Sequence, residues 1–172
     1  MIADLALRPE ASALVEQYSS GSPLCIFHKT DVSSWSALDS AFSAAIDAFK
    51  TLDIIVPGAG VFEPEFSNFW YPPGTPESID TVDGGRYKMM DINVTHPIRL
   101  TQIALQYFIR EKRKGSIVHV SSVAGQVSGL FTPMYFASKH AIHGFVRSLR
   151  SLEEELGVRV TAIAPGVIKV RS

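Results

Sequence analysis

The sequence is poor in three features that would each point to a particular class of protein. Its 172 residues include one cysteine, Cys25, which excludes an intrachain disulfide and a metal cluster built on thiolates. No apolar run approaches the roughly 20 residues that a membrane-spanning helix needs. The 16 basic and 17 acidic residues nearly cancel, so no strong field attracts nucleic acid or an anionic membrane. These absences predict a cytoplasmic protein that acts on a small molecule, without nucleic acid or membrane as a partner.

The chain does contain an alternation of short apolar runs and longer segments with helical periodicity. This pattern is typical of repeated strand–helix units and a parallel sheet. Strands are expected at residues 1–3, 24–28, 52–56, 116–121 and 159–164. Helices are expected at residues 9–19, 34–50, 87–112 and 134–156, with Pro97 kinking or restarting the third and Gly157 capping the fourth. We predict one α/β domain over residues 1–172, with strands buried on both faces because their apolar runs are nearly continuous.

The stretch from Phe62 to Gly85 is rich in proline, glycine and aromatic residues. It is therefore predicted to be a long irregular loop that overhangs the ligand crevice at the carboxyl ends of the strands. Its aromatic residues are Phe62, Phe66, Phe69, Trp70 and Tyr71. Phe66, Phe69, Trp70 and Tyr71 either form an apolar wall for a ligand or fix the loop to the core.

Three residues that can carry chemistry follow one another as Ser122, Tyr135 and Lys139. Ser122 follows an expected strand, and Tyr135 and Lys139 lie one turn apart on the next expected helix, so the three can converge. A free phenol is too weak an acid to act as a base at neutral pH, but a nearby ammonium group favours the phenolate. The set would exchange a proton with a substrate hydroxyl that the serine holds. The alternative is a core tyrosine, a surface lysine and a turn serine that share this spacing by chance.

Five further short motifs lie before, between and after these three residues. They are Asp4 after the first apolar run, Thr30-Asp31-Val32, Pro57-Gly58-Ala59-Gly60, Asp91-Ile92-Asn93-Val94 and Pro165-Gly166. With Ser122 and Tyr135-x3-Lys139, they make the chain resemble the short-chain dehydrogenase/reductase family over essentially its whole length. The resemblance implies a Rossmann-like doubly wound parallel sheet with helices on both faces. It also implies hydride transfer between a secondary alcohol or ketone and NAD, with NADP less favoured.

The same resemblance implies a role for each site residue. Tyr135 would be the acid/base, Lys139 would support it and hold the nicotinamide ribose, Ser122 would orient the substrate oxygen, and Asn93 would support a proton relay. The implied cofactor-binding residues are Asp4, Leu5, Asp31, Val32, Gly58, Ala59, Gly60, Tyr135, Lys139, Pro165, Gly166 and Ile168. The segment from Tyr135 to Phe145 is similar to members that resemble 15-hydroxyprostaglandin dehydrogenase. The two long helices would form a homo-oligomer interface.

Taken one at a time, several motifs have a simpler interpretation. Asp4 could be a frayed terminus and Asp31 a helix N-cap. Gly58 and Gly60 could only make a tight turn, and Asn93 could be an ordinary polar residue on a helix. The histidines His119, His140 and His143 lack partners at ligand spacing, which favours packed or helix-face side chains over a metal site.

The chain also departs from the family pattern. The Gly-rich turn Thr-Gly-x3-Gly-x-Gly that would hold the pyrophosphate is absent, and its strand with it, so the strands up to His28 would be separated from the rest by a gap. Pro57-Gly58 replaces Asn-Asn, and Val170 replaces a threonine. We therefore expect a chain that is truncated at both ends and has doubtful activity. The alternatives are a noncatalytic binding or oligomerisation module of the same fold and a sugar-nucleotide epimerase.

Overall fold

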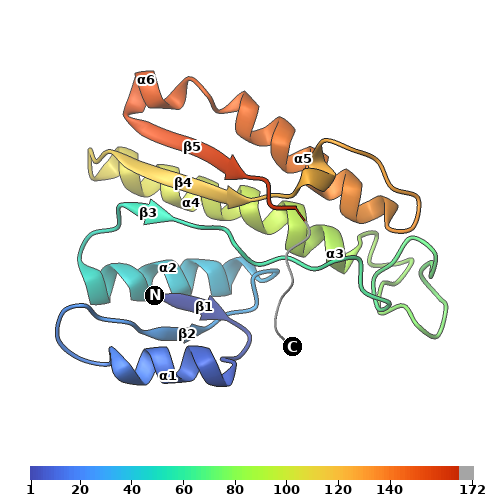
Figure 1. Ribbon diagram of the computed structural model, residues 1–172, viewed down its shortest axis with the longest axis horizontal. Helices are drawn as coiled ribbons and strands as arrows, with labels where there is room; N and C mark the ends of the chain where they lie inside the picture. The colour runs from blue at the N-terminus through green and yellow to red at the C-terminus, as the bar shows by residue number, and fades with distance from the viewer. Residues whose placement is uncertain (167–172) are drawn as a thin grey trace. The chain divides into compact units, whose positions relative to one another are not determined.

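Residues 1–166 are described in a computed structural model, in which the chain divides into two units, residues 1–52 and 53–172 (Figure 1). Each unit is described by itself. The described strands form two separate parallel sheets, one of two strands and one of three. Such a gap between the strands up to His28 and the others is expected from the sequence. The prediction of a single domain stays a prediction. None of the described helices is long and apolar enough to cross a membrane.

The first unit is built on two very short strands. β1 (Ile2–Asp4) pairs in parallel with β2 (Phe27–Lys29), so that Ile2 lies opposite Phe27. Between them, α1 (Pro9–Gln17) starts with a proline, which suits the first helical turn because no intrahelical N–H bond is lost there. α2 (Trp35–Phe49) follows β2 and buries a stripe of apolar side chains, made up of Leu38, Ala41, Phe42 and Ala45.

The second unit contains longer strands and most of the buried side chains. Its parallel sheet has the order β3 (Ile54–Ile55), β4 (Gly115–Val120) and β5 (Val158–Ile163). α4 (His96–Arg110) packs against β4, and α5 (Pro133–Ser148) and α6 (Leu152–Leu156) pack against β5 (Figure 1). A Cβ at Gly115 would overlap the ring of Phe108, so a glycine at this position lets α4 approach the sheet closely.

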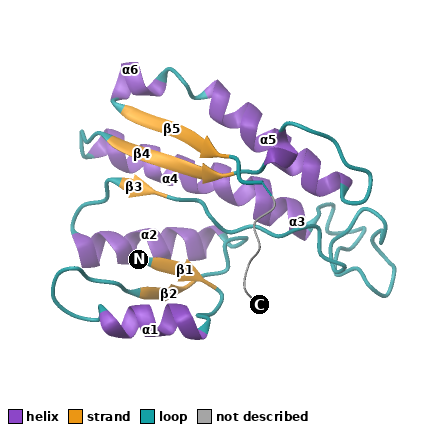
Figure 2. Ribbon diagram, viewed as in Figure 1, coloured by secondary structure: helices purple, strands orange, loops and turns teal. Residues whose placement is uncertain are grey.

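The helix predicted at residues 87–112 is divided into three pieces. A short α3 (Lys88–Met90) runs into a π-helical segment (Asp91–Thr95), and α4 then begins with Pro97 in its first turn. Pro97 lies in the first turn of α4, directly after the π-helical segment, and the backbone stays helical across this junction. Figure 2 shows that the segment between β3 and α3 is almost entirely loop, as its composition predicted. The helix predicted at residues 134–156 also breaks, between α5 and α6, and Gly157 ends α6 in a left-handed conformation with φ 68°.

The prediction that the strands are buried on both faces is wrong. Ile54 of β3 is 66% exposed, and β5 alternates, with Val158 and Val160 buried and Arg159 and Thr161 exposed. β3 and β5 are the edge strands of the described sheet, and the alternation in β5 is typical of a strand with one covered face. The strands around residues 24–28 and 52–56 are also shorter than predicted, because apolar composition does not by itself provide a pairing partner.

Candidate active site

Asn93 lies in the π-helical segment that precedes α4. A π-helical turn is rare and occurs frequently at functional sites. The buried Asn93 amide nitrogen donates to the carbonyl oxygen of Val61 at 2.8 Å, and its amide oxygen accepts from the N–H of Val61, also at 2.8 Å. The side chain thus pairs with the backbone after β3 as a strand would. The interpretation of Asn93 as an ordinary helix-face residue is wrong.

A buried serine connects Asn93 to Tyr135. The Asn93 amide donates to the hydroxyl oxygen of Ser138 at 3.2 Å, and Ser138 in turn donates to the carbonyl oxygen of Tyr135 at 2.7 Å. Sequence analysis did not single out Ser138. Its position three residues after Tyr135 is the signal that places it on the same helix face. Because Ser138 is fully buried, this link fixes the first turns of α5 against the π-helical segment.

Lys139, on α5, is a buried lysine whose ammonium group reaches the carboxyl end of β4. Only 7% of it is exposed, and its ammonium nitrogen donates to the carbonyl oxygen of Val120 at 3.0 Å. The same nitrogen lies 5.5 Å from the centroid of the Tyr135 ring. Burial lowers the pKa of Lys139, because a charged amine loses hydration there. The interpretation of Lys139 as a surface lysine is therefore wrong.

A glycine turn after β3 lies beside Asn93 and Lys139. A Cβ at Gly60 would lie 3.4 Å from the Asn93 amide oxygen and 3.7 Å from the Lys139 ammonium nitrogen. Gly58 and Ala59 are also exposed, so the backbone of this turn is accessible to a ligand. The turn is consequently part of the same group of residues as Asn93, Tyr135 and Lys139.

Ser122 follows β4 and caps a short 3-10 helical turn, Val123–Gly125. Its hydroxyl oxygen accepts from the N–H of Ala124 at 3.1 Å, which leaves the hydroxyl hydrogen able to donate elsewhere. The interpretation of Ser122 as a turn residue is therefore correct, and it is compatible with a second hydrogen bond to a ligand. The N–H of Val123 donates to the carbonyl oxygen of Pro165 at 3.0 Å, so the turn at Pro165–Gly166 lies next to it.

The candidate residues of the first unit lie at the carboxyl ends of its two strands. The carboxylate of Asp4 accepts from the N–H of Leu5 at 2.7 Å, and its carbonyl oxygen accepts from the N–H of Thr30 at 2.8 Å. Asp4 is therefore part of a paired strand, and its interpretation as a frayed terminus is wrong. The side chains of Asp4 and Leu5 are exposed.

Asp31 and Val32 occupy the turn between β2 and α2. The Asp31 carboxylate accepts from the N–H of Ser33 at 2.9 Å and from its hydroxyl at 2.6 Å. The alternative in which Asp31 is the N-cap of α2 is wrong, because Ser34 is the N-cap and accepts from the N–H of Ala37 at 3.3 Å. Ile168, the last candidate, lies outside the described residues.

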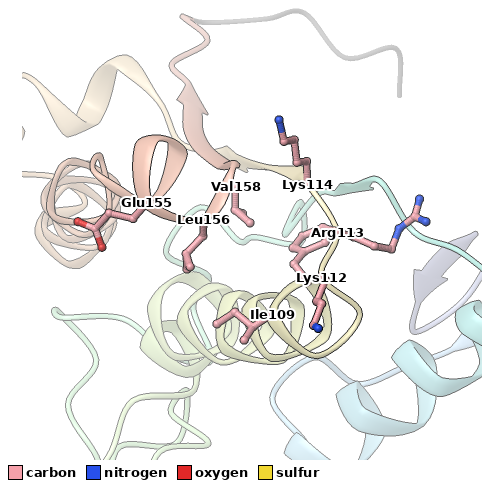
Figure 3. A pocket seen from close by; sticks show the side chains of 8 residues that line it. Ile109, Lys112, Arg113, Lys114, Glu155, Leu156 and Val158 are labelled. Atoms are coloured by element: carbon pink, nitrogen blue, oxygen red, sulfur yellow. The ribbon is translucent and has the colours of Figure 1, made fainter.

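A cavity of about 340 Å³ lies at the opposite end of the sheet, at the amino ends of β4 and β5. Ile109, Leu156 and Val158 form its apolar wall, and Lys112 and Lys114 stand at its rim. Figure 3 shows that the side chains of Lys112, Arg113 and Lys114 diverge and do not point at a common centre. The arrangement does not create a convergent anion site, and no candidate catalytic residue lines it.

Comparison with known proteins identifies the family. A model described as short chain dehydrogenase matches residues 3–172, that is, nearly the whole chain. The chain belongs to the short-chain dehydrogenase family. It is 32% identical over 138 residues to the dehydrogenase/reductase SDR family member 7B of Mus musculus, with 80% of this chain and 39% of the relative covered. It is 28% identical over 152 residues to the short-chain dehydrogenase/reductase prx7 of Penicillium rubens, with 86% and 53% covered.

Solved structures support the Rossmann-like α/β fold, with parallel sheets and helices. A short-chain dehydrogenase from Streptomyces avermitilis superimposes with a TM-score of 0.75 at 23% identity, covering 99% of this chain and 58% of that one. LigO from Sphingobium sp. gives a TM-score of 0.76, also at 23% identity. This short-chain dehydrogenase thus spans about 40 to 60% of the length of the relatives it matches. The similarity to 15-hydroxyprostaglandin dehydrogenase is not tested by these relatives and stays a prediction.

Members of the family usually bind NAD or NADP, and the residues present fit part of such a cofactor. The exposed glycine turn at Gly58–Gly60 and the buried ammonium of Lys139 provide backbone and cation for a ribose. The residues present do not supply the Gly-rich turn whose N–H groups would hold a pyrophosphate. The residues present thus offer groups suited to a ribose and no Gly-rich turn for a pyrophosphate.

Proposed function

We propose that this chain carries the proton-transfer residues of an NAD(P)-dependent oxidoreductase that interconverts a secondary alcohol and a ketone. The observation that supports this most is the buried ammonium of Lys139, held 5.5 Å from the ring centroid of Tyr135. Burying a charge is costly, and perturbed ionisable groups cluster at functional sites, so a buried ammonium beside a tyrosine supports a role in the chemistry of that tyrosine. The nicotinamide cofactor, when bound, supplies or accepts the hydride.

In oxidation, Tyr135 accepts the proton of the substrate hydroxyl, and in reduction it returns a proton to the ketone oxygen. Ser122 donates its hydroxyl hydrogen to the same substrate oxygen and so orients it. The ammonium of Lys139 stabilises negative charge on the phenol oxygen when its proton leaves. Asn93 keeps the glycine turn and α5 together through Val61 and Ser138.

The residues proposed to hold the cofactor are those that the family resemblance implies. For the nicotinamide ribose they are Gly58, Ala59, Gly60, Tyr135, Lys139, Pro165, Gly166 and Ile168. For the adenosine they are Asp4, Leu5, Asp31 and Val32. The carboxylate of Asp4 favours NAD over NADP, since it would repel a 2′-phosphate. A cytoplasmic location and a homo-oligomer formed through the α3–α4 and α5–α6 helices complete the proposal.

The substrate is proposed to be apolar or aromatic. The ring of Phe62, which is largely exposed, stands edge-on to the Tyr135 ring with 4.7 Å between centroids. The indole N–H of Trp70 donates to the carbonyl oxygen of Phe131 at 3.2 Å, which joins two loops that carry exposed aromatic side chains. Apolar surface beside the proposed acid/base favours an apolar alcohol over a polyol.

Replacing the proposed acid/base tests the function directly. Tyr135→Phe removes the hydroxyl and keeps the ring, so we expect turnover of secondary alcohols to fall by about 10²- to 10⁴-fold. Tyr18→Phe, which removes a hydroxyl at the end of α1, is the matched control and should retain turnover. Normal activity of Tyr135→Phe in a steady-state NADH absorbance assay would contradict the proposal.

A second candidate function, a noncatalytic module of the same fold, is favoured by the missing Gly-rich turn. A fluorescence titration with NADH separates the two. The absence of NADH binding by a folded chain of this length would support the module, and saturable binding would support the oxidoreductase.

A further inference from the structure

Glu63 is an acidic residue that the mechanism above does not use, although the fold buries it. Only 5% of Glu63 is exposed, whereas glutamate is rarely buried unless its carboxylate has partners. Its backbone also has a φ of 36°, in the left-handed region that residues other than glycine seldom adopt. Such a conformation persists where the surroundings hold it firmly, and it occurs often at functional sites. Burial and backbone together indicate that the position of this carboxylate is closely determined.

Both carboxylate oxygens of Glu63 accept a backbone hydrogen bond. One accepts from the N–H of Phe69 at 3.2 Å and so closes the aromatic loop, residues 62–71, on itself. The other accepts from the N–H of Tyr135 at 2.9 Å, across 72 residues of sequence. The backbone oxygen of Glu63 accepts from the side chain of Asn68 at 3.1 Å, which strengthens the same loop.

The bond to Tyr135 replaces the cap that α5 lacks. Tyr135 is the third residue of α5, so its N–H is one of the first four that have no partner inside the helix. The N-cap residue, Thr132, makes no side-chain capping bond. A carboxylate is the preferred group at this end of a helix because it complements the helix dipole. Glu63 therefore caps α5 from the loop after β3.

The residue before Glu63, Phe62, contacts the side chain of Tyr135. The ring of Phe62 meets the Tyr135 ring edge-on, at 4.7 Å between centroids and 68° between planes. Two adjacent residues of one loop thus contact both the backbone and the ring of Tyr135. A change in the loop at this point would move the phenol as well as the helix end.

We propose that Glu63 is a positioning residue, which orients the phenol of Tyr135 by joining the aromatic loop, residues 62–71, to the first turn of α5. This inference rests on the proposed function, in which Tyr135 is the acid/base. Glu63 acts through Tyr135 and through Phe62 beside it. A ligand that moves the aromatic loop would consequently change the orientation of the phenol.

The test compares Glu63→Ala, Glu63→Gln and a matched control, Glu65→Gln. Glu65 is an exposed carboxylate in the same loop, so its replacement removes the same charge without these bonds. In nuclear magnetic resonance spectra of the folded chain, we expect Glu63→Ala to speed hydrogen exchange of the Tyr135 amide by about tenfold or more. We also expect it to weaken the nuclear Overhauser contact between the Phe62 and Tyr135 rings. Glu63→Gln should recover part of both signals, since its amide oxygen still accepts one bond.

Turnover provides the readout that a purely structural cap would not move. We expect Glu63→Ala to lower kcat by about 10- to 100-fold, with the KM for the cofactor unchanged, because misplacing a reacting group by about 1 Å costs that much. Thermal unfolding curves of each variant show whether it is folded at the temperature of the assay. Unchanged exchange and ring contact in Glu63→Ala, or an equal loss of kcat in Glu65→Gln, would overturn the inference. If Tyr135→Phe keeps full turnover, the proposed function fails, while the spectra still decide whether Glu63 positions Tyr135.

Discussion

The two units of the chain hold their candidate residues in different ways. In residues 1–52, the carboxylates of Asp4 and Asp31 are exposed and bind groups one or two residues away. In residues 53–166, Asn93 reaches Val61 across 32 residues and Ser138 across 45. Local turns form from a short segment of chain, whereas bonds across such separations exist only in the folded unit. The residues proposed for proton transfer therefore lie where the folded structure itself brings distant segments together.

The second unit also has longer paired strands and more buried side chains than the first. β4 and β5 pair along six residues each, and Ile117 and Phe108 beside them are almost completely buried. β1 and β2 pair along three residues, and no residue of α1 is buried. A buried charge needs hydrogen-bond partners, and the carbonyl oxygen of Val120 at the end of β4 is one for the Lys139 ammonium. The comparison teaches that the buried core of this chain is concentrated in residues 53–166, the same residues in which the proposed proton-transfer groups lie.

The largest effect should follow from removing that ammonium. Lys139→Met keeps the length of the side chain and removes its charge, so we expect turnover to fall by about 10²- to 10⁴-fold. Lys29→Met, at the exposed end of β2, is the matched control and should retain turnover. Steady-state assays of both variants make the measurement. A similar loss in the two variants would break the comparison between the units.

Core substitutions should have a smaller but still large effect, on the free energy of unfolding. Ile117→Ala removes a side chain that is 0% exposed in the middle of β4, and we expect it to cost about 3 to 4 kcal/mol. Leu14→Ala on α1 removes a side chain that is 45% exposed, and we expect about 0.5 kcal/mol or less. Urea unfolding monitored by circular dichroism measures both. Equal costs would contradict the view that the second unit dominates stability.

Acid should destabilise the second unit through a buried histidine. The Thr101 hydroxyl donates to the carbonyl oxygen of Pro97 and so accepts from the Nε2–H of His119, at 3.1 Å. The other ring nitrogen of His119 then has a lone pair, with no hydrogen-bond partner among the described residues. Burial first, and repulsion from His96 second, lower the pKa of His119 from 6.5 to about 4. A proton added to this ring would be buried without an acceptor.

The sign of the effect on stability follows from proton uptake. Between pH 6.5 and about 4, the unfolded chain binds more protons at this site than the folded chain, so the free energy of unfolding falls as the pH falls. A difference of this size corresponds to about 3 kcal/mol at most. Burial also lowers the pKa of His96, which adds to the loss. Unfolding curves from pH 7.5 to 4 should show this decline, and His119→Leu should flatten it. A variant that declines as steeply as the parent would contradict the assignment.

Sequence patterns predicted the order and type of the elements because strand–helix alternation has a clear period. Helical spacing also predicted that Tyr135 and Lys139 share one face of a helix, and the Lys139 ammonium nitrogen lies 5.5 Å from the Tyr135 ring centroid. The convergence of Ser122 with these two residues stays a prediction. They failed for strand burial at Ile54, because exposure depends on which strand lies at an edge. No local signal in the sequence indicated the π-helical turn or the position of Glu63. Both depend on bonds between segments that are far apart in the chain.

The smallest effect should come from the first unit, at Asp4. Its exposed carboxylate bonds to the N–H of Leu5, so it does not need a ligand to stay in place. If it contacts the adenosine ribose, Asp4→Ala should lower the preference for NADH over NADPH by about five- to tenfold, because one charge repelling a 2′-phosphate near the solvent contributes little more. Fluorescence titrations of both cofactors measure the ratio. Asp47→Ala, an exposed carboxylate on α2, controls for net charge. An unchanged ratio for Asp4→Ala would contradict a role for Asp4 in cofactor selection.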